Sequence, residues 1–304
     1  MIECCLTIDF EDWSYNTLRN IGATPRAREG ALHKAYDRLM DFLAERGCRK
    51  ALTFFTTGQV ARDCPRIVRR IAEDGHEIAC HGFHHDHVSE KDRASFAAEL
   101  DLAIRVLGDA SGQRIRGYRA PMFSMRPFDE WAYEEIAARF DYDASLVTAR
   151  RYRGSGPADE LRFGGRTLRE FPFCSVRVWG GVPIPVLGGT YLKVMSARTA
   201  IDLVRESARR GFLPMVYLHP YELLYEGELA LGWHELHNLS TVKRIYWQVR
   251  QHQWISVGNA GLLPKLRALL AEVPPVGRIC DLPDAAKAPV SEEPSRLTYN
   301  LPAA

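Results

Sequence analysis

The stretch CCLTIDFED, residues 4–12, passes from a short apolar run directly into three carboxylates. An apolar run of this length is typical of a buried strand. The next apolar residues recur at helical spacing and are followed by Gly47, a helix-stop signal; they are Leu32, Tyr36, Leu39 and Leu43. This part of the chain therefore predicts a strand and then a helix, with acidic groups at the carboxyl end of the strand.

The same unit recurs along the chain. Further apolar or β-forming runs and helical patterns predict strands at 51–57, 76–80 and 213–218, and helices at 63–75, 89–107 and 196–211. Ser89 and Asp92 resemble a capping box before the second of these helices. Alternating strands and helices imply a parallel sheet covered by helices, either open or closed into a (β/α) barrel, with chemistry at the carboxyl ends of the strands. Residues 161–192 lack helical periodicity and indicate an antiparallel insertion or a substrate-facing loop system.

The composition is that of a globular protein with a full core. Of 304 residues, 46% are hydrophobic and 26% are charged, and the formal charge of +2 argues against a nucleic-acid partner. Seven cysteines without a repeated spacing indicate reduced, buried thiols. We expect a cytoplasmic protein without a membrane span, because the sequence shows neither a signal-peptide pattern nor an apolar run of about 18 residues.

One large domain is favoured, because no linker composition divides the first 270 residues. The segment from Pro274 onward contains six of the chain's 17 prolines and shows no apolar periodicity. We therefore expect residues 273–304 to form an extended or disordered tail.

The carboxylates of the first strand are the first candidate site. Asp9, Glu11 and Asp12 lie within four positions of one another. Like charges this close raise one another's pKa or require a cation, so a general base or a metal site is physically reasonable. Strand alternation points Asp9 and Glu11 to the same side, whereas Asp12 joins them only after a turn.

The third strand leads into CHGFHHDH, residues 80–87, which holds four of the ten histidines. The spacing of His81 and His85 presents two imidazoles to one metal ion. His84 and His87 either support the metal ligands without binding the ion or are merely exposed. Two histidines and one carboxylate suit zinc, or cobalt or nickel, with hydrolysis as the natural chemistry and Asp9 placed to accept a proton from water.

Two further strand ends carry candidate residues. In GYRAPMF, residues 117–123, Arg119 could hold a catalytic carboxylate in its ionised form. In VYLHP, residues 216–220, an apolar strand ends in His219, which a parallel fold would bring to the same rim as Asp9 and His81.

Taken in order, TIDFED, HGFHH, RAP, YDAS and LHP resemble the motif series of the polysaccharide deacetylases, the NodB-homology domain of carbohydrate esterase family four. The DFEDW and LHPYEL variants are most similar to the branch found beside exopolysaccharide and surface-glycan assembly genes. The resemblance implies a single distorted (β/α) barrel in a catalytic domain over residues 1–272, with core motifs at 2–222 and a C-terminal extension at 223–272.

The resemblance also implies roles for individual residues. One divalent metal ion, usually zinc, would be held by an aspartate together with His81 and His85. Asp9 would act as base, with Arg119 orienting it. His219 would protonate the departing amine, with Asp143 near enough to tune it.

The sequence departs from the usual family pattern at two places. Asp9 is followed by Phe10, Glu11 and Asp12 rather than by a second aspartate, so the third metal ligand is either Glu11 or Asp12. The backbone N–H of Met122, which follows Pro121, would stabilise the oxyanion. Many members carry an aromatic residue at the position of Met122, so this departure bears on the sugar subsite and the substrate range.

The expected function is the metal-dependent removal of N-acetyl groups from an amino sugar in a polysaccharide or a lipid-linked glycan intermediate. One alternative is a deformylase or another linear-amide hydrolase of the same fold. A second is a non-catalytic carbohydrate-binding protein, whose sugar-stacking aromatics would include Trp179, Tyr191 and Trp233. The sequence does not predict the oligomeric state.

Overall fold

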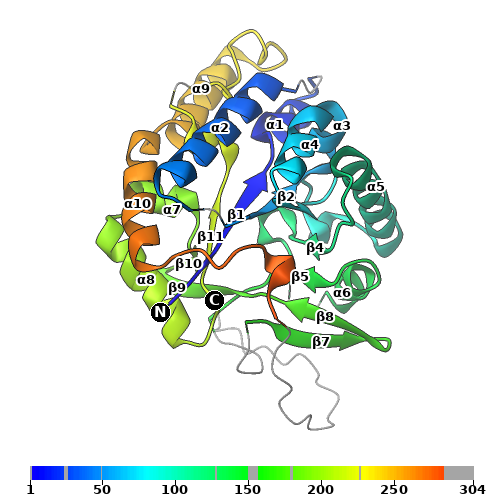
Figure 1. Cartoon of the computed structure of the whole chain (residues 1–304). Coiled ribbons are helices and arrows are strands. Elements are labelled where there is room, and N and C mark those ends of the chain that lie inside the picture. Colours follow the sequence, from blue (N-terminus) through cyan, green and yellow to red (C-terminus); the bar gives the residue numbers. More distant parts are fainter. Residues whose placement is uncertain are drawn as a thin grey trace.

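The computed structural model describes residues 2–23, 27–48, 50–126, 129–149, 157–178, 181–225 and 227–283 (Figure 1). Its centre is an eight-stranded sheet in the order β11-β1-β2-β3-β4-β5-β8-β7, in which every neighbouring pair except β7 and β8 is parallel. The strands are β1 (Cys5–Phe10), β2 (Thr53–Thr56), β3 (Glu77–Cys80), β4 (Gly117–Tyr118), β5 (Tyr142–Asp143), β7 (Asp159–Phe163), β8 (Arg166–Glu170) and β11 (Met215–Leu218).

The sheet is curled, with helices packed on its outer side (Figure 1). Strands β1, β2, β3 and β11 are buried along their whole length, as expected of parallel strands covered on both faces. The helices before β11 are α1 (Trp13–Asn20), α2 (Glu29–Glu45), α3 (Gly58–Asp63), α4 (Pro65–Glu73), α5 (Arg93–Ser111), α6 (Glu130–Ala137), α7 (Gly189–Val194) and α8 (Ala197–Arg209). Short 3-10 turns cover η1 (Val88–Glu90) and η2 (Pro121–Phe123).

A second sheet of three strands, in the order β10-β9-β6, lies beside the main sheet. Its strands are β6 (Val147–Thr148), β9 (Phe173–Val178) and β10 (Val182–Val186). The chain after β10 runs along β11, because Leu187 N–H donates to Met215 O and Tyr217 N–H donates to Leu187 O. The predicted α/β fold with a distorted (β/α) barrel is confirmed.

The antiparallel pairing predicted within residues 161–192 is present in two hairpins, β7 with β8 and β9 with β10. Although this stretch lacks helical periodicity, it ends in a helix, because α7 begins at Gly189. A six-residue helix is too short to show a periodic apolar pattern.

Side chains cap the N-termini of four α-helices in the described residues. The hydroxyls of Ser196 and Ser240 cap the helices that follow them, as predicted for Ser196. The helix predicted to open at Ser89 instead begins at Arg93, and Asp92 is its N-cap, accepting from Ser95 N–H. A carboxylate satisfies the first free N–H groups of a helix as well as a serine does.

The C-terminal part holds η3 (Pro220–Leu223), α9 (Thr241–Ile255), η4 (Asn259–Gly261), α10 (Leu262–Glu272) and η5 (Ile279–Asp281). Of the expected tail, residues 273–283 lie against the barrel: Pro274 O accepts from Cys4 N–H, and Ile279 is fully buried. The rest of the tail lies outside the described residues. No helix in the described part of the chain is long and apolar enough to cross a membrane.

Candidate active site

The predicted site residues follow strands that are neighbours in the main sheet. Asp9 lies near the end of β1, His81 directly after β3, Arg119 directly after β4 and His219 directly after β11. These strands are parallel, so their carboxyl ends meet at one end of the barrel. The fold thus brings together side chains that are up to 210 residues apart in sequence.

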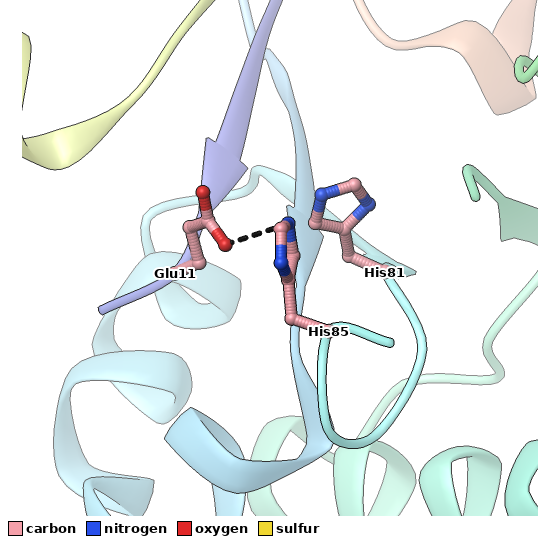
Figure 2. Close-up of side chains that lie close together, drawn as sticks. All are labelled: Glu11, His81 and His85. Carbon is pink, nitrogen blue, oxygen red and sulfur yellow. Dashed lines mark ion pairs between the residues drawn. The ribbon is translucent and has the colours of Figure 1, made fainter. Parts of the chain in front are cut away.

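Glu11, His81 and His85 form a compact group that could hold a metal ion (Figure 2). One ligand atom from each lies within 4.8 Å of the others. His85 Nε2 lies 2.8 Å from Glu11 Oε2, and the rings of His81 and His85 are 5.1 Å apart between centroids. Glu11 and His81 are buried and His85 is nearly so, which limits access by bulk water.

The backbone fixes which nitrogen His81 presents to this group. His81 Nδ1 lies 2.8 Å from the carbonyl oxygen of Arg119, which can only accept, so Nδ1 carries the proton and Nε2 is left as a ligand atom. Burial lowers the pKa of His81 to about 4, which favours this neutral form. Burial alone would raise the pKa of Glu11, but the neighbouring His85 and the other histidines lower it to about 2.

The loop that carries His85 is anchored by its own backbone. Gly58 N–H donates to Gly82 O, Gln59 N–H donates to Phe83 O, and Phe83 N–H donates to the carboxylate of Glu99. His85 itself has a φ of 59°, a left-handed conformation that costs energy in a residue with a Cβ. These hydrogen bonds hold the loop so that His85 turns back toward Glu11.

The structure separates the two alternatives for the carboxylate ligand. Glu11 lies in the group with the two histidines, whereas Asp12 is the N-cap of α1 and accepts from both the N–H and the hydroxyl of Ser14. Burial, partly offset by the bonds from Ser14, raises the pKa of Asp12 to about 6. The side chain of Asp12 is therefore engaged in holding the first helix, and Glu11 is the better candidate.

Asp9 is paired with Arg119 inside the barrel. Arg119 Nη1 donates to Asp9 Oδ1 at 2.5 Å and to the hydroxyl of Thr7 at 2.9 Å. The guanidinium is fully buried, with its centre 3.9 Å from the ring centroid of Phe55. The other carboxylate oxygen of Asp9, Oδ2, lies 4.0 Å from His81 Nε2 and so faces the candidate metal group.

His219 lies on the other side of that group. Its Nε2 is 3.8 Å from Glu11 Oε1, and its Nδ1 is 3.3 Å from Glu222 Oε2. Burial alone would lower the pKa of His219, but the charges of Glu222, Glu11 and Asp9 raise it to about 9. Glu222 was not predicted from the sequence; the available signal was its spacing of three from a strand-end histidine, the spacing of a capping box.

The carboxylate that contacts His219 is that of Glu222, and the expected role of Asp143 in tuning His219 stays a prediction. Asp143 instead accepts from the hydroxyl of Ser145, and Ser145 Oγ accepts from Ala120 N–H at 2.7 Å. Burial raises the pKa of Asp143, and burial together with Asp143 raises that of Glu170. Asp143 therefore supports the turn that follows Arg119.

That turn holds the predicted oxyanion residues. Pro121 is buried, whereas Met122 is 55% exposed and has a φ of 56°. The next residue, Phe123, also has a left-handed φ, and its ring packs edge-on against Phe173 and Tyr217. The ring of Phe123 thus anchors the strained turn inside the barrel, and the side chain of Met122 is exposed at the surface.

The donor set fits a divalent metal ion. Two imidazoles and one carboxylate are typical ligands of a catalytic zinc site, in which a further position is left to water or substrate. The fixed tautomer of His81 and the ionised Glu11 provide two of these ligands in the protonation state that a metal requires.

Two family models match separate parts of the chain. Residues 25–137, which include His81, His85 and Arg119, match the family model of the polysaccharide deacetylases. Residues 152–259, which include His219 and Glu222, match a model described as a domain of unknown function, DUF3473.

Two curated relatives are deacetylases. The chain is 30% identical over 83 residues to a peptidoglycan-N-acetylmuramic acid deacetylase of Bacillus subtilis, covering 27% of this chain and 31% of that protein. It is 34% identical over 84 residues to a chitooligosaccharide deacetylase of Sinorhizobium fredii, covering 27% of this chain and 38% of that protein. The matched part is thus about a third of the length of these relatives.

Two solved structures share the fold. One, from Mycobacterium smegmatis and assigned to the polysaccharide deacetylases, has a TM-score of 0.50 and 22% identity, covering 90% of this chain and 93% of that one. The other is an allantoinase with a TM-score of 0.52 and 16% identity, covering 90% and 91%. Residues 25–137 thus match the polysaccharide deacetylase family, which confirms the resemblance predicted from the motifs.

Proposed function

We propose that this protein is a metal-dependent hydrolase that removes the N-acetyl group from an amino sugar of a polysaccharide or of a lipid-linked glycan intermediate. The observation that carries the proposal is that a set of candidate metal ligands, a carboxylate and a further histidine lie together at one end of the barrel. Glu11, His81 and His85 form a metal-ligand set, with Asp9 on one side and His219 on the other. The deacetylase names of the two curated relatives support the choice of substrate.

Glu11, His81 and His85 would hold the metal ion, most simply zinc, with cobalt or nickel as alternatives. When bound, such an ion supplies a Lewis acid that polarises the amide carbonyl and acidifies a water molecule.

The chain's own residues supply the proton transfers. Asp9 accepts a proton from the attacking water at Oδ2, while Arg119 holds Oδ1 in place by donating a hydrogen bond to it. The N–H of Met122 donates to the carbonyl oxygen as negative charge develops there. The water oxygen then bonds to the carbonyl carbon, and the C–N bond breaks. His219 donates a proton from Nε2 to the departing nitrogen, which leaves acetate and a free amine.

The alternative amide substrates would use the same water and the same acid, so only a substrate profile distinguishes them. Of the aromatic residues expected in a binding-only protein, Trp179 lies outside the described residues. The cytoplasmic location and the exopolysaccharide branch stay predictions.

The test combines metal content with acetate release. We expect purified wild-type protein to hold about one zinc-like ion per chain and to release acetate from chitin oligosaccharides. His81→Ala should lose both the metal and the activity. Asp9→Asn should keep the metal and lose about 100-fold or more in kcat, because it removes only the base. Loss of metal in both variants, or full activity in either, would contradict these roles.

A matched pair of variants separates the two carboxylates that follow Asp9. Glu11→Gln should lower the metal content, because it removes a charged ligand. Asp12→Asn should leave the metal content unchanged, since asparagine also caps a helix. The reverse result would make Asp12 the ligand.

A further inference from the structure

Helix α9 carries its apolar side chains on the outside. Val242, Ile245, Tyr246 and Val249 are 77%, 53%, 59% and 54% exposed. Their spacing of three, four and seven places them on one stripe of the helix, which we call the α9 stripe. A surface helix normally turns such a stripe toward the core, so this one is oriented the opposite way.

The opposite face of α9 is anchored by amide groups. Gln251 is buried and accepts from Leu231 N–H at 2.7 Å while donating to Leu231 O. Gln248 also donates to Leu231 O, at 2.8 Å. Trp247 packs against the cluster of Leu18, Leu231 and Leu236. Because these contacts fix the rotation of the helix, the α9 stripe stays exposed.

The stretch of sequence that contains α9 carries formal charge of one sign. Residues 236–271 contain no aspartate or glutamate but contain Lys243, Arg244, Arg250, Lys265 and Arg267. Lys243 and Arg250 are exposed and, seven residues apart, lie along one border of the stripe. The exposed ring of Trp254 lies 5.3 Å from the guanidinium of Arg250.

We propose that the α9 stripe binds the surface of an anionic lipid bilayer. An amphipathic helix with aliphatic and aromatic residues on one face and cations at its border lies in the interface, with the apolar side chains among the acyl chains and the cations at the headgroups. A second copy of this chain fits less well, because it would bring the cations of two copies together without a carboxylate from either helix.

Helix α9 lies at the same end of the barrel as the candidate metal ligands. Trp247 of α9 shares its cluster with Leu18 of α1, the helix that begins two residues after Glu11. In Figure 1, α9 lies at the end of the barrel toward which β1 points. A bilayer bound to the α9 stripe would therefore lie near the end of the barrel that holds the candidate metal ligands. The binding itself does not depend on the proposed activity.

Co-sedimentation with vesicles tests the proposal. The full chain should sediment with vesicles of phosphatidylcholine and phosphatidylglycerol, bind vesicles of phosphatidylcholine alone at least about tenfold more weakly, and dissociate at high salt. The double variant Ile245→Gln, Val249→Gln should bind at least about tenfold more weakly than wild type. The double variant Lys243→Gln, Arg250→Gln should lose affinity by a similar factor.

The matched control is Arg105→Gln with Arg198→Gln, which removes the same charge from exposed positions on α5 and α8. It should bind as wild type does, and unchanged thermal unfolding should show that all variants are folded. Failure of wild-type protein to bind anionic vesicles would overturn the proposal. The proposal would also be overturned if wild-type protein formed a dimer and the double variant Ile245→Gln, Val249→Gln were a monomer. A second copy of the chain would then occupy the α9 stripe.

Discussion

Arg119 shows how a single buried charge organises the site. Its guanidinium is enclosed by the rings of Phe55 and Phe173, which provide no counter-charge, so the carboxylate of Asp9 is its one ionic partner among the described residues. A buried ion pair is costly to form, and breaking it by removing one partner is costlier still. The same interaction orients the carboxylate of Asp9, as the proposed base requires.

We predict that Arg119→Met lowers the free energy of unfolding by about 3–5 kcal/mol, because it leaves Asp9 buried without its partner. The control is Arg114→Met, which removes a largely exposed guanidinium from Asp141 and should cost about 0–1 kcal/mol. Denaturant unfolding of the two variants measures both values. Similar losses in the two would show that the buried pair has no special weight.

At the scale of elements, the short strand β4 depends on the absence of a side chain. A Cβ on Gly117 would lie 1.9 Å from Cζ of Tyr142, the neighbouring residue on β5. The hydroxyl of Tyr142 donates to the buried carboxylate of Glu77 on β3, so the ring cannot move without breaking that bond. Gly117 therefore lets three strands pack closely just before Arg119.

Gly117→Ala should lower the free energy of unfolding by about 1–3 kcal/mol or more, because the added methyl group overpacks a closed space. The matched substitution Gly30→Ala in α2 meets nothing within 4 Å and should stabilise the protein by up to about 1 kcal/mol. Thermal melts of the two variants should therefore shift in opposite directions. A neutral Gly117→Ala would mean that β4 and β5 are less tightly packed than described.

At the scale of the whole molecule, the segment after α10 closes the barrel at the amino ends of the strands. Val276 N–H donates to Cys4 O, Ile279 N–H donates to the hydroxyl of Thr53, and Cys280 N–H donates to the carboxylate of Glu77. This segment thus joins the start of β1 to the starts of β2 and β3, at the opposite end from the candidate site.

Ile279→Ala should cost about 2–5 kcal/mol of unfolding free energy, because Ile279 is fully buried in this closure. The same substitution at Ile245, which is exposed on the α9 stripe, should change stability by less than about 0.5 kcal/mol. Chemical denaturation compares the two variants directly. An equally small effect at Ile279 would indicate that residues 273–283 add little to the core.

The strand-and-helix units and the separate candidates Asp9, His81, His85, Arg119 and His219 were predictable, because periodicity and residue type are local properties of a sequence. Glu222 was missed although it lies three residues from His219, since only the folded turn places its carboxylate against the ring. The contact of Asp143 with Ser145, and through it with Ala120, was not predicted, because it depends on the pairing of β4 with β5.

The sequence by itself determined the class of fold and the kinds of side chain at the strand ends, because buried strands and helices impose their spacing on apolar residues. Only the tertiary structure favours Glu11 over Asp12 as the candidate ligand, since both carboxylates follow the same strand and Asp12 caps α1. It also decided that α9 turns its apolar stripe outward, because the inward face is set by Gln248 and Gln251 binding a distant loop. Contacts of this kind join residues that the sequence separates, so no local pattern contains them.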